Sequence, residues 1–81
     1  MAYKREDLEK QMRESASDYV GCKPEELNLD KKLRDEYGIT SIEATELILE
    51  IEDRYKIRIP TEDALKILST NDAIEYVIKH T

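Results

Sequence analysis

Cysteine, glycine and proline are scarce in this chain, and phenylalanine and tryptophan are absent. With Cys22 as the one cysteine, the chain can form no internal disulfide and no metal site made of several cysteines. Because its neighbours are apolar and no histidine partner is in sight, we expect Cys22 to be a buried structural thiol. A reducing, cytoplasmic compartment is the default expectation. No apolar run is long enough to cross a bilayer, and no signal-peptide core follows the charged N-terminus. Two glycines and two prolines favour helices joined by few tight turns.

Positive charge is also in deficit, since 19 acidic residues face 13 basic ones and the net charge is −6. Nucleic acids and anionic membranes select basic surfaces, so neither is an expected partner. An acidic surface is steered instead towards basic proteins. With 81 residues, 40% of them hydrophobic, the chain is expected to form a single domain over residues 1–81 and to be a monomer.

Apolar residues recur at helical spacing near the N-terminus, which predicts a first helix from about Lys4 to Val20. Gly21 is a natural C-terminal stop, and Pro24 enforces it. The residues of that helix expected to face the core are Leu8, Met12, Ala16, Tyr19 and Val20. From Cys22 to Thr40 we expect a long loop that packs down through its apolar residues, with a short helical turn at Pro24–Leu27. Those apolar residues are Leu27, Leu29, Leu33 and Tyr37.

The second helix has the clearest start in the chain, because Thr40 and Glu43 fit a capping box around Ser41 and Ile42. Helical projection from there to Tyr55 places two aliphatic residues, Ile42 and Leu49, opposite the core, among carboxylates. The predicted core stripe consists of Ala44, Leu47, Ile48, Ile51 and Tyr55.

The remaining chain predicts an extended tether, Ile57–Pro60, followed by two more helices. Thr61 is expected to cap a short third helix at Glu62–Leu68, and either Ser69 or Thr70 to cap a last helix that ends near Lys79. The last helix should bury Ala73, Ile74 and Val77. The predicted fold is therefore all-α: a four-helix bundle with three longer helices, a short third helix and a long first loop.

Catalytic and metal chemistry have little support in the residues. The only histidine, His80, is penultimate and expected to be solvent-exposed, so a hydrolase built on Ser41 would lack a base. Asp30 and Asp35 do not fit an EF-hand loop. We expect no catalytic and no metal-binding residues. Ser41 itself follows the cap, so its hydroxyl is free at the positive end of a helix, which favours an anion such as a phosphate ester.

At this point a family resemblance becomes visible. Gly38 to Leu47 resembles the Gly-x-Asp-Ser-Leu-(acid)-x-x-Glu-Leu pattern of acyl carrier proteins. Ile51 to Pro60 is similar to that family's Leu-Glu-Glu-x-Phe-x-Ile-x-Ile-Pro, and Thr70 to Val77 resembles its final helix. The order and spacing of these segments cover nearly the whole chain.

The resemblance implies a four-helix fold in which Ser41 receives 4′-phosphopantetheine from coenzyme A. The thiol of that arm would carry acyl groups as thioesters in fatty-acid, polyketide or related biosynthesis. The implied partners are a phosphopantetheinyl transferase and acyl-loading, acyl-transfer or condensing enzymes with basic docking patches. The residues that would meet these partners, carried over by position, are Thr40, Ile42, Thr45, Glu46, Leu49, Glu52 and Asp53.

Two positions depart from the family pattern. Thr40 stands in place of the family's aspartate, which keeps a cap but removes a charge, and Thr45 stands where an aliphatic residue is commoner. Both departures favour dedicated partners. The alternative from the residues alone is an acidic helical interaction module that carries no prosthetic group, and mass measurement after exposure to a transferase and coenzyme A would separate the two.

Overall fold

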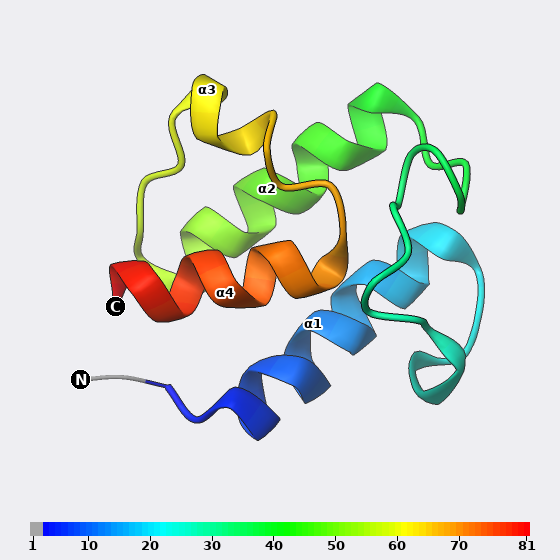
Figure 1. Ribbon diagram of the computed structural model, residues 1–81, viewed down its shortest axis with the longest axis horizontal. Helices are drawn as coiled ribbons and strands as arrows, with labels where there is room; N and C mark the ends of the chain where they lie inside the picture. The colour runs from blue at the N-terminus through cyan, green and yellow to red at the C-terminus, as the bar shows by residue number, and fades with distance from the viewer. Residues whose placement is uncertain (1–2) are drawn as a thin grey trace.

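The computed structural model describes residues 3–81, which form four α-helices and one short 3₁₀-helix. The helices are α1 at Arg5–Val20, α2 at Ser41–Tyr55, α3 at Thr61–Ala64 and α4 at Thr70–His80, and the 3₁₀-helix spans Pro24–Glu26. The described part of the chain contains no β-strand, only an isolated antiparallel β-bridge between Lys32 and Ser69. The predicted all-α fold, with three longer helices and a short third one, is confirmed. Figure 1 shows α3 set apart at one end of α2.

The core lies between α1, α2 and α4, where the predicted stripes meet. Leu8 on α1 and Ile74 and Val77 on α4 are fully buried, and Leu47, Ile51 and Tyr55 of α2 are at least 94% buried. Ala44 and Ile48, which were also predicted to face the core, are half-buried against it. Apolar residues that recur at helical spacing on α1, α2 and α4 therefore account for the packing of the three helices.

Gly21 ends α1 as predicted. It adopts the left-handed conformation (φ 85°), and its N–H donates to the carbonyl of Ser17, so an orphan carbonyl of the last turn is satisfied. Cys22 follows directly and is half-buried against the core, so the prediction of a buried thiol is wrong in degree. The reason is its position in the bend after the stop, where the backbone leaves the helix.

The long connection between α1 and α2 packs against the bundle as expected. Leu27 and Leu33 are buried, while Leu29 and Tyr37 are half-buried. Backbone bonds fasten it to the start of α4: the Leu33 N–H donates to the Leu68 carbonyl at 2.9 Å, and the Asn71 N–H donates to the Leu29 carbonyl at 2.8 Å. The loop therefore forms a wall over the end of the bundle where α2 begins (Figure 1).

The third helix differs from its prediction in both extent and cap. It spans Thr61–Ala64 with Pro60 as N-cap, so Thr61 is its first residue and not its cap. The N–H groups of Lys66 and Ile67 bond to carbonyls three residues back, which tightens the turn. The N–H groups of Leu68 and Ser69 then donate to the Asp72 carboxylate. Because these two N–H groups bond to the Asp72 carboxylate at the start of α4, they do not extend the third helix to Leu68.

Of the two residues considered as the N-cap of the last helix, Ser69 and Thr70, the structure has Ser69. Its Oγ accepts a hydrogen bond from the Asp72 N–H at 3.1 Å, completing a capping box. None of the helices among residues 3–81 is long and apolar enough to cross a membrane.

Candidate functional site

Ser41 is the first residue of α2, and its hydroxyl takes no part in capping the helix. Thr40 Oγ1 accepts from the Glu43 N–H at 3.1 Å, and the Glu43 carboxylate accepts from the Thr40 N–H at 2.8 Å. The capping box predicted from the sequence is thus present. Because both ends of the box are occupied, the Ser41 hydroxyl remains available, and it is exposed.

Exposure separates Ser41 from every other serine. The chain has four serines, and Ser15, Ser17 and Ser69 are all at least 92% buried. Each of the three also has a structural hydrogen bond: Ser15 Oγ accepts from Arg54, Ser17 Oγ donates to a backbone carbonyl, and Ser69 caps α4. Among the serines, only Ser41 therefore offers a hydroxyl that a modifying enzyme can reach without unfolding the chain.

The electrostatics at Ser41 suit a negatively charged adduct. The first N–H groups of a helix point outward from its N-terminus, and the helix dipole places partial positive charge there. A phosphate esterified to the Ser41 oxygen would lie at this end of a helix 15 residues long. The chemistry of the site therefore fits a phosphodiester arm.

A cavity of about 460 Å³ lies beside Ser41, which is one of its lining residues. Its volume falls within the roughly 300–1,000 Å³ typical of small-molecule sites, and most of its lining is apolar. Walls come from α2, the tether and α3 and include Ala44, Ile48, Ile59, Ala64 and Leu65. A hydrocarbon chain attached near Ser41 would find an apolar chamber next to it.

The exposed aliphatic residues predicted on α2 are found where expected. Ile42 is 71% exposed and Leu49 is 57% exposed. Thr45 lies between them and is also exposed, with its hydroxyl donating to the Ser41 carbonyl at 3.0 Å. Because that hydroxyl already has a backbone partner, Thr45 can lie between Ile42 and Leu49 in a contact surface without needing a hydrogen bond from the partner protein.

The five acids of α2 have different positions, which sequence spacing did not reveal. Glu43 closes the capping box, and Glu52 accepts from the Ile59 N–H at 2.7 Å, which fixes the tether to α2. Glu46 and Asp53 are exposed, and Asp53 has only a loose pair with Lys56 at 3.9 Å, between side chains that are 89% and 81% exposed. Such a surface pair contributes little stability, so both carboxylates are free to meet a partner.

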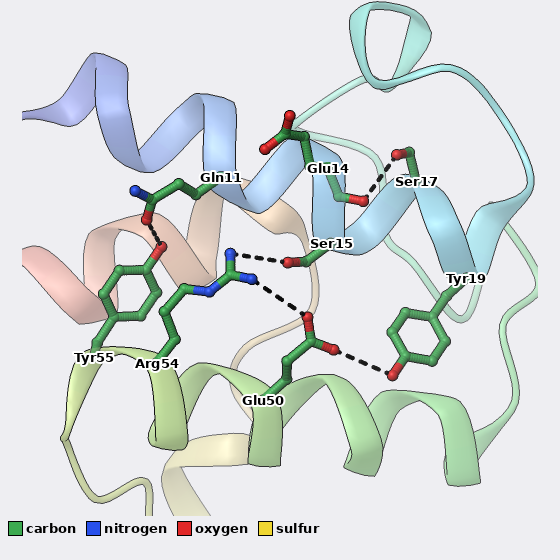
Figure 2. Close-up of polar contacts among 8 residues, drawn as sticks. All are labelled: Gln11, Glu14, Ser15, Ser17, Tyr19, Glu50, Arg54 and Tyr55. Atoms are coloured by element: carbon green, nitrogen blue, oxygen red, sulfur yellow. Dashed lines mark hydrogen bonds and ion pairs between the residues drawn. The ribbon is translucent and has the colours of Figure 1, made fainter.

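The fifth acid, Glu50, lies on the side of α2 that faces α1, with its side chain 40% exposed. Figure 2 shows its carboxylate between Arg54 and Tyr19, with Arg54 Nη2 at 3.9 Å and the Tyr19 hydroxyl donating at 3.4 Å. Burial, followed by the nearby Glu50 charge, raises the pKa of Tyr19. In the same view Arg54 also donates to Ser15 Oγ, and Tyr55 donates to Gln11 at 2.5 Å. This polar seam fixes the rotation of α2, so that the opposite face is the one presented to solvent.

The surface residues missed by sequence reasoning lie just after α3. Leu65 is 72% exposed and Leu68 is 45% exposed, and both line the cavity beside Ser41. Two leucines in a short segment that also carries Glu62, Asp63 and Lys66 were the available signal. Their position next to α2 depends on the tertiary fold.

The C-terminal end of α4 has a separate aromatic and polar cluster. His80 is exposed, as predicted, and stacks on Tyr76 with ring centroids 3.9 Å apart. The Tyr76 hydroxyl donates to the Asp63 carboxylate at 2.7 Å, and this bond raises the pKa of Tyr76 to about 12. The bond ties α3 to α4. No group of three or more candidate ligand side chains within residues 3–81 is arranged to hold a metal ion.

Comparisons with known proteins agree with this geometry. A family model described as "Phosphopantetheine attachment site" matches residues 10–77. The acyl carrier protein of Chloroherpeton thalassium is 40% identical over 60 residues, which span 74% of this chain and 75% of that protein. A solved structure of the acyl carrier protein from Enterococcus faecalis matches with a TM-score of 0.84 over 98% of this chain and 100% of that one. At 24% identity this last likeness concerns the fold.

Proposed function

The chain belongs to the acyl carrier protein family, and from that premise we propose that Ser41 is its phosphopantetheine attachment site. The observation that supports this most strongly is that Ser41 is the one exposed serine, with a hydroxyl left free by the cap at the start of α2. The prosthetic group of the family is 4′-phosphopantetheine, whose terminal thiol holds acyl groups as thioesters. The protein is a carrier and not an enzyme.

The residues around Ser41 would then have separate roles. The Ser41 oxygen forms the ester to the arm, and the N-terminus of α2 stabilises the phosphate charge. The capping box of Thr40 and Glu43 holds the backbone that presents Ser41. The apolar cavity next to Ser41 shelters the hydrocarbon part of the cargo from water, and burial of each methylene there contributes about 0.8 kcal/mol.

The face of α2 that carries Ile42 and Leu49 would be the docking surface for the transferase and for acyl-transfer or condensing enzymes. Two exposed aliphatic residues supply apolar contact, while Glu46 and Asp53 supply charge that steers a basic partner into place. Thr45 lies within this surface, between the two aliphatic residues, and Thr40 is exposed next to Ser41. Glu52 contributes mainly by fixing the tether. We further propose that residues 1–81 act as one monomeric domain in the cytoplasm, in fatty-acid, polyketide or related biosynthesis.

The attachment site can be tested by intact mass after incubation with coenzyme A and a broad-specificity phosphopantetheinyl transferase. The wild-type chain is expected to gain one arm, and Ser41→Ala to gain none. Ser17→Ala is the matched control, because its hydroxyl is buried and only donates to the Glu14 carbonyl, so it should gain one arm like wild type. An arm on Ser41→Ala would refute the assignment. A wild-type chain that binds basic partners but never gains mass would favour the docking module without a prosthetic group.

A further inference from the structure

Lys56 adopts a backbone conformation that lysine rarely takes. It directly follows the last residue of α2, and its φ of 56° and ψ of 44° lie in the left-handed region. Within residues 3–81 it is the one residue other than glycine with a positive φ. Glycine commonly fills this position at helix ends, because it has no Cβ to crowd the backbone. A lysine here therefore carries a conformational cost that glycine or asparagine would reduce.

The side chain of Lys56 returns little stability for that cost. Among residues 3–81 its one ion pair is with Asp53 at 3.9 Å, and the two side chains are 81% and 89% exposed. Exposed pairs of this kind add little or nothing to folding. A cation near the end of a helix also favours the helix dipole, but Arg54 already supplies one in the last turn of α2. The reason for a lysine at this position therefore lies outside the folding of the chain.

Lys56 lies at the end of the docking surface of α2. The exposed residues of that surface follow one another at steps of three or four residues, so they form one stripe along the helix. The ion pair with Asp53 places the Lys56 ammonium on the same stripe. At 1.5 Å per residue, the distance along α2 from Ser41 to Lys56 is about 22 Å. The members of the stripe are Ile42, Thr45, Glu46, Leu49, Asp53 and Lys56.

The charge of this stripe changes sign along its length. Glu46 and Asp53 are exposed carboxylates, and Lys56, about one turn beyond Asp53, is positive. A complementary protein has basic groups opposite the two carboxylates and an acidic group opposite Lys56. Docking in the reverse direction would bring like charges together, so this order fixes the direction in which the partner lies on α2. The direction matters because Ser41, at the other end of the stripe, must enter the partner's active site.

We propose that Lys56 is a specificity determinant for the phosphopantetheinyl transferase that modifies Ser41, and that its ammonium pairs with a carboxylate of that enzyme. The contact counts most for the transferase, because it docks before any arm is present and surface contacts alone must orient Ser41. Enzymes that act later can also hold the arm itself. The transferase surface then presents basic side chains to Glu46 and Asp53 and an acidic side chain to Lys56. This inference rests on the carrier function proposed above.

The test measures arm transfer to the full apo chain by the transferase encoded in the same genome, at low salt and over a range of carrier concentrations. Lys56→Asn removes the charge but suits the left-handed conformation, Lys56→Glu reverses the charge, and Lys56→Arg keeps it. Lys10→Gln is the matched control, because Lys10 is an exposed lysine of α1, which packs on the other side of α2. Urea unfolding is measured for every variant.

Lys56→Asn should raise the KM for the carrier about fivefold and Lys56→Glu about tenfold or more, with kcat little changed, since docking is affected and chemistry is not. Lys56→Arg and Lys10→Gln should react like wild type. The urea midpoint of Lys56→Asn should be no lower than that of wild type, because no stabilising contact is lost. Carbodiimide, which joins an amine to a carboxylate in direct contact, should crosslink Lys56 to an aspartate or glutamate of the transferase.

A wild-type KM in both Lys56→Asn and Lys56→Glu would overturn the proposal, as would a crosslink map in which Lys56 joins no carboxylate of the transferase. A urea midpoint well below that of wild type in Lys56→Asn would also refute it, by showing that the lysine serves stability. A failure of the carrier function itself is distinguishable, because the wild-type chain would then gain no mass from coenzyme A with any transferase, and the proposal would fall with it.

Discussion

Two leucines that lie two residues apart on α2, and so on opposite faces of it, allow folding and docking to be tested separately. Leu47 is 6% exposed in the core, whereas Leu49 is 57% exposed among carboxylates. Truncation of a buried leucine to alanine costs about 2–5 kcal/mol, because a cavity remains where the side chain was. Full burial of a leucine contributes roughly 1.5–3 kcal/mol, and Leu49 keeps less than half of that contact, so Leu49→Ala should cost below about 1 kcal/mol.

These two costs differ enough to measure. A domain of this size has a stability of roughly 4–12 kcal/mol, so Leu47→Ala removes a large share of it and Leu49→Ala a small one. With a urea slope of about 1–3 kcal/mol/M, the midpoint should fall by ~1–2 M for Leu47→Ala and by a few tenths for Leu49→Ala. The same two proteins are then compared in the rate of arm transfer by a phosphopantetheinyl transferase.

We expect Leu49→Ala to fold nearly as well as wild type and yet to react more slowly, because apolar contact at the docking surface is lost. Leu47→Ala, assayed well below its unfolding midpoint, should react at close to the wild-type rate. If Leu49→Ala lost as much stability as Leu47→Ala, the assigned rotation of α2 would be wrong. If it folded and reacted like wild type, the exposed face of α2 would not be the docking surface.

Three further predictions follow from the same geometry. Thr40→Asp should change the unfolding free energy by less than about 1 kcal/mol, because threonine and aspartate are both good N-cap residues. It should also speed arm transfer by a general transferase. An unchanged initial rate would show that Thr40 does not limit recognition by that transferase. Glu46→Lys should slow association with a basic partner and flatten its dependence on salt, measured by stopped-flow kinetics, because an exposed steering charge is reversed. Tyr76→Phe should cost about 1 kcal/mol near pH 8, where the bond to Asp63 is intact. Because the folded-state pKa of Tyr76 is raised to about 12, above its ordinary value of 10.0, its stabilisation is complete below pH 10 and is lost as pH rises towards 12. The variant should therefore lose less stability than wild type in urea unfolding across that window.

Short-range patterns in the sequence determined most of the helical framework. The capping box at Thr40 and Glu43, the stop at Gly21 and the apolar spacing of α2 act within one or two helical turns, so their consequences are present in the local sequence. The same periodicity that buries Leu47 leaves Leu49 exposed, which is why the accessible face of α2 and the free hydroxyl of Ser41 were predictable.

Contacts between distant segments decided what local patterns could not express. Glu50 and Glu52 belong to one acidic run, yet they have different partners. The Tyr19 hydroxyl of α1 donates to the Glu50 carboxylate, and the Ile59 N–H of the tether donates to the Glu52 carboxylate. Likewise the third helix does not continue to Leu68, because the Asp72 carboxylate at the start of α4 accepts from the N–H groups of Leu68 and Ser69. The cavity beside Ser41 exists only once α2, α3 and α4 are packed together, because a cavity is the space left between surfaces and no single segment encodes it.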